Sequence, residues 1–405
     1  MFGVLTDVSF HSVKSRIAIT LSILSTAGIL FFTLRRGGTE LTSGWSYNLT
    51  SGDAALAELI QNILLFIPLG LSLTLAGVRP WRGVTIGALL SFTVEFLQQW
   101  IPGRDPNIGD IVTNTIGTAL GVLLVVAAPI WLWAPPRRSV WQARLTAALA
   151  VLVWYGTGAM LRQTFPPPPY HIVTTPDFSF FGHYEGEVLT VTPGLRSLAV
   201  IAVAAPHPPG RTSPLMALLD QRDERALMLS VDGPDLTLRY AMPALHATLE
   251  QPDLRLRGAM KSVAPGDTFT AATWHDSTNI CLRLNATARC HLGYTIGDGW
   301  KLIFYPEGRP AWVLGMINTL WMAGCVIGVG LWAARARSHG GGGALAAGIV
   351  IVGLLMVPLV TGLKPTPIYE WIGALGGMAV GYVLSSVNDR ALKACPERSE
   401  GRRLL

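Results

Sequence analysis

The chain has 405 residues, of which half are apolar and only 14% are charged, and its mean hydropathy is +0.42. This composition is too apolar for an ordinary soluble enzyme. The net charge of +6 would suit a nucleic-acid-binding protein, but the basic residues flank apolar runs and form no patch, which excludes nucleic acid as a partner. The four cysteines are too few for a disulfide scaffold and lack the spacing of a zinc finger.

Eight apolar stretches are long enough to cross a hydrocarbon core, which takes about 20 helical residues. Only Glu95 and Glu370 place a formal charge inside any of these stretches, and Glu370 lies near the start of its own. A charge in the middle of a span is costly, so Glu95 is the residue that needs an explanation. In chain order the predicted spans are 17–34, 59–78, 83–101, 111–134, 145–161, 311–334, 344–363 and 368–387.

The distribution of Lys and Arg predicts the orientation of these spans. Basic residues are far more numerous in the loops on the side of the N-terminus than in the alternate loops, so both termini are expected in the cytoplasm and residues 162–310 outside a bacterial inner membrane. The predicted domains are a five-helix transmembrane domain (1–161), an extracytoplasmic domain (162–310), three C-terminal transmembrane helices (311–387) and a disordered cytoplasmic tail (388–405).

Residues 162–310 carry charge at an ordinary density and show short apolar runs broken by turn residues. Two hairpins are predicted, one around Asp232-Gly233-Pro234 and one around Asn285-Ala286. The number and spacing of the predicted strands indicate an all-β sandwich. The predicted strands are 197–204, 226–231, 236–240, 268–274, 278–284 and 287–292.

Cys281 and Cys290 lie four positions on either side of the second turn and therefore face each other. A disulfide is predicted because an extracytoplasmic compartment is oxidising; the alternative is two free thiols in a strand pair.

The run Thr273-Trp274-His275-Asp276, together with Gly299-Trp300, resembles the concanavalin-like jelly roll of LamG-type modules. Such modules often bind glycans or calcium, although many are only structural. The sequence lacks a cluster of acidic residues that would fix a calcium ion. A glycan remains a candidate partner of this domain.

Polar residues gather in the second, third and fourth spans at offsets of three, four and seven, which place them on single helix faces. A short hairpin, residues 102–109, joins the last two of these spans. In the predicted orientation, three helices bring one polar cluster toward the outer leaflet. Its members are Asn62, Glu95, Gln98, Arg104, Asp110 and Asn114.

The pattern Asn-x3-Phe-x-Pro-x-Gly, Glu-x2-Gln, Arg, then Asp-x3-Asn-x2-Gly-x3-Gly, running from Asn62 to Gly121, resembles the VanZ-like family. This resemblance implies a polytopic bacterial membrane protein linked to resistance to the glycopeptide antibiotic teicoplanin. It also implies that Glu95, Gln98, Arg104, Asp110 and Asn114 form the family's polar signature. The expected architecture is an α-helical polytopic membrane protein of about eight transmembrane helices with an inserted all-β, LamG-like jelly-roll sandwich.

A second, shorter echo of this pattern lies near the C-terminus. Ile372-Gly373 and Gly377 follow Glu370 at the offsets at which Ile116-Gly117 and Gly121 follow Asn114. Either the chain contains an internal repeat, or small residues simply recur where transmembrane helices pack closely.

Several roles are open to the polar cluster. In a structural role, Glu95 pairs with Arg104 and the amides hold the helices together. In a functional role, Arg104 engages a lipid or polyprenyl phosphate of a cell-wall precursor, Asn62, Gln98 and Asn114 help bind it, and Glu95 and Asp110 serve as catalytic bases or as ligands of a divalent cation.

Two further alternatives remain. One is a transporter with Glu95 as proton carrier, and the other is a non-enzymatic sensor that binds a glycan or protein at the sandwich face around Trp274. Zinc and thioester chemistry are excluded in the polar cluster because it contains no histidine or cysteine, and no cofactor is predicted.

Overall fold

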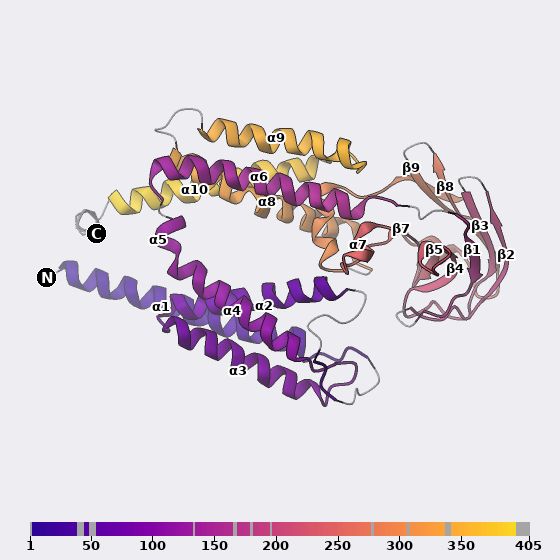
Figure 1. Ribbon diagram of the computed structural model, residues 1–405, viewed down its shortest axis with the longest axis horizontal. Helices are drawn as coiled ribbons and strands as arrows, with labels where there is room; N and C mark the ends of the chain where they lie inside the picture. The colour runs from indigo at the N-terminus through magenta and orange to yellow at the C-terminus, as the bar shows by residue number, and fades with distance from the viewer. Residues whose placement is uncertain are drawn as a thin grey trace. The chain divides into compact units, whose positions relative to one another are not determined.

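The computed structural model describes residues 2–38, 44–47, 54–132, 134–164, 168–178, 181–194, 197–276, 279–305, 308–336 and 342–393. The chain forms two compact units, Met1–Arg138 and Ser139–Leu405. Figure 1 shows the elements of both units, and each unit is described by itself.

In its described residues the first unit is built from helices, and α2 and α4 form the most extensive helix contact in it. Glycines allow this approach, because a Cβ atom added at Gly117 or Gly121 would collide with the α2 carbonyls of Ile63 or Ile67. A small apolar core lies beside this pair and includes the fully buried Phe66. The helices are α1 (Phe2–Thr33), α2 (Ala55–Leu75), α3 (Pro80–Gln98), α4 (Ile108–Val126) and the short α5 (Ala128–Trp131).

The second unit combines four long helices with a β domain that is inserted between the first two of them. Trp154 of α6 is fully buried among apolar residues of α8 and α9, including Met322 and Val350. The helices are α6 (Pro136–Leu161), α8 (Ala311–Arg335), α9 (Gly342–Thr361) and α10 (Ile368–Lys393).

All eight predicted spans fall on helices, and six helices of the described part of the chain are long and apolar enough to cross a membrane: α1, α2, α4, α6, α8 and α9. The two that fall short of this hydropathy, α3 and α10, carry Glu95 and Glu370. Large apolar side chains such as Phe31 and Leu359 point outward, as expected for helices that face lipid. The chain is therefore a multi-pass membrane protein.

Three predicted boundaries need correction. The stretch 111–134 is not one helix, because the chain turns at Ala127 between α4 and α5. The fifth span is longer than predicted, since α6 begins at Pro136. Residues 388–393, predicted to be a disordered tail, continue α10, whereas 394–405 lie outside the described residues.

The β domain is the predicted sandwich of two five-stranded antiparallel sheets. Side chains from both sheets, among them Leu229, Leu238, Val200 and Phe269, form one buried core, which shows that the sheets pack face to face. One sheet has the order β1-β4-β5-β6-β7 and the other β10-β9-β8-β3-β2. The strands are β1 (His171–Thr174), β2 (Glu187–Pro193), β3 (Ser197–Val203), β4 (Ser213–Leu219), β5 (Arg225–Asp232), β6 (Asp235–Tyr240), β7 (Leu254–Leu256), β8 (Thr268–Asp276), β9 (Asn279–Leu284) and β10 (Thr287–Leu292).

Both predicted hairpins are confirmed as the β5–β6 and β9–β10 pairs, and a disulfide joins Cys281 to Cys290 across the second. Three short helices complete the domain: α7 (Pro243–His246), η1 (Ala259–Ser262) and η2 (Ile296–Leu302).

The sandwich is fixed to one end of its own helix bundle (Figure 1). The Tyr240 hydroxyl donates to the carbonyl of Leu161, the last residue of α6, at 3.4 Å. Lys364, in the loop between α9 and α10, donates from its side chain to the His291 carbonyl at 2.7 Å and from its backbone to the Tyr294 carbonyl at 2.9 Å. The end of α6 and the loop between α9 and α10 thus hold the β domain in place.

Candidate functional site

Glu95 lies near the end of α3 and is only 2% exposed. Its Oε2 atom accepts a hydrogen bond of 2.9 Å from the backbone N–H of Asn107. Asn107 is the N-cap of α4 and accepts, with its own side chain, the N–H of Gly109 at 2.9 Å. The carboxylate therefore ties the end of α3 to the start of α4.

Gln98 and Arg104 contact the last turn of α1, which the sequence did not place in the cluster. Gln98 donates to the Thr33 carbonyl at 3.1 Å. Arg104 donates from Nε to the Arg35 carbonyl and from Nη2 to the Phe32 carbonyl, both at 2.9 Å. Carbonyl groups at a helix C-terminus have no partner within the helix, so these two side chains cap α1.

The ion pair between Glu95 and Arg104, which the structural alternative requires, is absent from the described residues, where no contact within 4 Å joins the two charged groups. The physical reason is that the α1 carbonyls take up the Arg104 guanidinium. Burial lowers the pKa of Arg104 from its ordinary value, and the nearby charge of Arg35 adds to this effect. Glu95 instead has a backbone N–H as its partner.

Asn62, Asp110 and Asn114 bring α2 and α4 together at the same end of the unit. The Asn62 side chain hydrogen-bonds to the Asp110 carboxylate. Asn114 is 2% exposed and donates from Nδ2 to the Ser91 hydroxyl of α3 at 2.9 Å. Its other polar atom, Oδ1, is buried and finds no hydrogen-bond donor in the structure.

This arrangement has more acceptors than donors. The amide N–H groups of Asn62, Gln98 and Asn114 are all directed to protein acceptors. The carboxylates of Glu95 and Asp110 and the carbonyl oxygen of Asn114 keep lone pairs to spare. The polar cluster can therefore receive hydrogen bonds from a ligand more readily than it can donate them.

A short segment before α2 covers the start of α4, and sequence reasoning did not find it. Ser46 pairs with Asn107 as an isolated β-bridge, donating to the Pro106 carbonyl at 2.9 Å and accepting the Ile108 N–H at 3.0 Å. Trp45 stacks on Phe92 of α3, with 6.2 Å between ring centroids. The hint in the sequence is the pair of aromatic residues, Trp45 and Tyr47, in a loop rich in Gly, Ser and Thr.

No metal centre is assembled by the side chains that the structure describes, since these contain no group of three or more His, Cys, Asp or Glu residues suited to hold an ion. Glu95 and Asp110 have hydrogen-bond partners of different kinds, one a backbone N–H and the other a side-chain amide.

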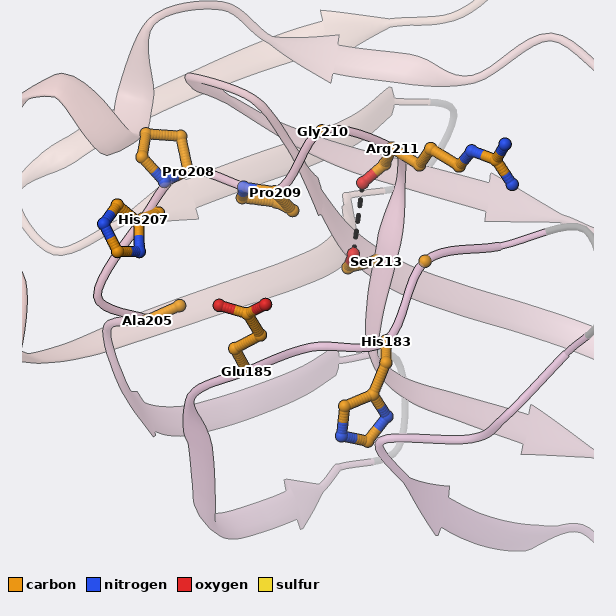
Figure 2. A pocket seen from close by; sticks show the side chains of 10 residues that line it. His183, Glu185, Ala205, His207, Pro208, Pro209, Gly210, Arg211 and Ser213 are labelled. Carbon is orange, nitrogen blue, oxygen red and sulfur yellow. Dashed lines mark hydrogen bonds between the residues drawn. The ribbon is translucent and has the colours of Figure 1, made fainter. Parts of the chain in front are cut away.

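The β domain contains a separate open pocket of about 550 Å³. Figure 2 shows the Glu185 carboxylate pointing toward the space below Pro209, whereas the side chains of His183 and Arg211 point away from that space. Trp274, the centre of the predicted binding face, does not line this pocket; it lies in β8 under the guanidinium of Arg283, 5.8 Å from its ring centroid. The likeness of the domain to LamG-type modules stays a prediction.

The comparisons with known proteins concern the first unit. Residues 9–132 match the family model described as VanZ/LLP1. Neither a curated protein nor a solved structure matches the chain. The matched region contains most of α1, all of α2 to α5 and every residue of the polar cluster. The N-terminal part of this membrane protein is thus similar to the VanZ/LLP1 family.

Proposed function

We propose that this protein acts in the bacterial cell envelope, on or around a lipid-linked or cell-wall component, and that the polar cluster of the first unit is its working site. The observation that carries this proposal is the buried Oδ1 atom of Asn114, which has no hydrogen-bond donor. Asn114 shares α4 with the carboxylate of Asp110, and the neighbouring α3 carries that of Glu95. Buried polar atoms are normally satisfied, so one without a partner suggests a site that a ligand completes.

The proposed location is the outer leaflet of the inner membrane. Lys and Arg are more numerous in the loops that share the N-terminus's side of the membrane than in the alternate loops, and this supports cytoplasmic termini. All six members of the polar cluster would then lie toward the outer surface. The β domain would also lie outside, and its disulfide suits an oxidising compartment.

Within the site, we assign the following roles. Glu95 and Asp110 are the candidate bases, while Asn62, Gln98 and Asn114 are the candidate residues that bind the headgroup. Arg104 is half-buried, and Arg35 and Arg36 nearby are exposed, so these cations supply the positive charge that a lipid or polyprenyl phosphate would meet at the rim.

The association of VanZ proteins with teicoplanin supplies a phenotype for the test. A deletion strain is complemented with the wild-type gene, Glu95→Gln or Asp110→Asn, and teicoplanin susceptibility and envelope integrity are measured at equal membrane expression. Both variants should fail to complement. Asp105→Asn is the matched control, because Asp105 is exposed in the adjoining loop, and it should complement fully. Complementation by Glu95→Gln and Asp110→Asn would overturn the proposal.

A second candidate function is non-enzymatic recognition of a glycan or protein by the β domain, and the open pocket beside Glu185 favours it. In that case Glu185→Ala and His207→Ala should abolish the envelope phenotype while Glu95→Gln retains it. A transporter is supported less well, because the polar groups of α2, α3 and α4 gather at one end of these helices and a path across the membrane needs them at several depths.

A further inference from the structure

The helix pair α8/α10 of the second unit repeats the helix pair α2/α4 of the first in register. In the first pair, Gly117 faces the carbonyl of Ile63 and Gly121 that of Ile67. In the second pair, Gly373 faces the carbonyl of Thr319 and Gly377 that of Ala323. Each of these four residues lies 256 positions after its counterpart, as do the first residues of the helices, Ala55 of α2 and Ala311 of α8.

The equivalence is confined to these two pairs. Gly353 of α9 packs against Trp154 and Val151 of α6, while Gly87 of α3 packs against Thr118 of α4. Helices α3 and α9 therefore contact neighbours that are not equivalent. Position 95 of the first unit has no carboxylate at the same offset, since residue 351 is an isoleucine.

The same offset relates the polar residues of the two pairs. Asn318 of α8 corresponds to Asn62 of α2, and Glu370 of α10 corresponds to Asn114 of α4. Glu370 is fully buried and has three donors: the Thr295 hydroxyl, the Gly297 backbone N–H at 3.1 Å and the Asn318 amide at 3.1 Å. Asn318 in turn accepts the indole N–H of Trp300 at 2.7 Å.

The chain itself fills this second polar site. Thr295, Gly297 and Trp300 belong to η2 and its N-cap, which follow the last strand of the sandwich. Lys301 of η2 pairs with Asp298 at 2.6 Å and is not among the described residues that bond to Glu370. Burial alone raises the pKa of Asp298, but the Lys301 ammonium and hydrogen bonds outweigh burial and lower it. The groups that reach Glu370 are thus a neutral hydroxyl and neutral N–H groups.

We infer that the polar cluster of the first unit binds the sugar portion of a lipid-linked cell-wall component, through a hydroxyl and an amide N–H such as an N-acylated amino sugar offers. Asn114 occupies the position of Glu370, and its Oδ1 lacks the donors that η2 supplies in the second pair. This inference rests on the proposed function and specifies its ligand.

The donor and acceptor inventory supports a sugar over a phosphate in the interior of the cluster. A phosphate needs donors, but the amides of the cluster are engaged and Arg104 caps α1. A sugar hydroxyl or an amide N–H brings the donor that Asn114 lacks, and the phosphate of the same molecule remains with the arginines at the rim.

The test uses the purified full-length protein in lauryldimethylamine oxide, a detergent without sugar. Three probes with the same alkyl chain are titrated: octyl N-acetylglucosaminide, octyl phosphate and octylammonium. The wild-type protein should bind the amino-sugar probe most tightly. Asn114→Leu should weaken that affinity by about tenfold or more, as expected for the loss of one buried hydrogen bond. Gln99→Leu is the control, because Gln99 bonds only to the Phe96 carbonyl of its own helix, at 3.2 Å.

Asn114→Asp guards against a folding defect, since it keeps an acceptor and can accept the Ser91 hydroxyl; it should retain amino-sugar binding. Stronger binding of octyl phosphate or octylammonium, no binding of the amino-sugar probe, or equal affinity in Asn114→Leu would each overturn the inference. Amino-sugar binding without an envelope phenotype for Glu95→Gln would instead remove the proposed function and leave the inference standing. An envelope phenotype for Glu95→Gln without amino-sugar binding would overturn the inference and leave the proposed function standing.

Discussion

Arg104 binds backbone carbonyls instead of a carboxylate, and this decides what the polar cluster offers to a ligand. Its two hydrogen bonds cap α1 at Phe32 and Arg35. Sequence patterns identified Arg104 and offered Glu95 as its partner in one alternative, because a carboxylate is a visible partner whereas the carbonyls of a helix end are present in every sequence. The residue types of a site can thus be predicted, but not which backbone groups they bind.

Arg104→Gln should destabilise the protein, because it removes the charge-assisted hydrogen bonds that hold the end of α1. A loss of about 1–3 kcal/mol is expected from the usual strength of hydrogen bonds to charged groups. Thermal unfolding of the detergent-solubilised protein measures it. Arg104→Lys should recover little, since one ammonium does not match two carbonyls as a planar fork does. Arg36→Gln, at an exposed position in the loop that follows α1, should change little.

Glu95→Gln should retain stability close to that of the wild-type protein. The glutamine carbonyl can still accept the Asn107 N–H, and Arg104 keeps its own partners. The same thermal assay measures the change. A loss of stability as large as that of Arg104→Gln would mean that the two side chains do form a structural pair, and the account of the site would then be wrong.

At the scale of elements, hydrophobic periodicity predicted every long helix, since a membrane span needs a long apolar run. Short apolar runs broken by turn residues also predicted β3, β5, β6, β8, β9 and β10. This pattern missed β1, β2, β4 and β7, because β1 and β7 are very short and β4 begins with Ser213-Pro214, which reads as a turn. It could not show that η2 fills the second polar site, since that contact joins residues about 75 positions apart.

The register of the α8/α10 pair can be tested with two glycines on the same helix. A Cβ atom at Gly373 would collide with the Thr319 carbonyl, whereas Gly376 has open space around it. Gly373→Ala should destabilise the second unit by about 1–3 kcal/mol, the usual cost of overpacking. Gly376→Ala should be neutral or stabilise by up to about 1 kcal/mol through helix propensity. Thermal unfolding of both variants gives the comparison, and equal effects would contradict the proposed register.

For the whole molecule, the orientation predicted from basic residues can be measured by labelling. Asp223 in the β domain is 79% exposed at its side chain, and Arg79 precedes α3 on the opposite side of the predicted topology. After native thiols are blocked, a cysteine at position 223 should react with a membrane-impermeant reagent in intact spheroplasts and one at position 79 should not. Labelling at position 79 alone would invert the protein and place the polar cluster at the cytoplasmic leaflet.

The two units of the molecule offer two candidate working sites, the polar cluster and the β-domain pocket. The most direct measurement compares teicoplanin susceptibility of a deletion strain complemented by Glu95→Gln with that of the strain complemented by Glu185→Gln, each at wild-type membrane expression. We predict that Glu95→Gln fails to complement and that Glu185→Gln complements fully. Full complementation by Glu95→Gln, together with failure of Glu185→Gln to complement, would contradict this assignment of the working site.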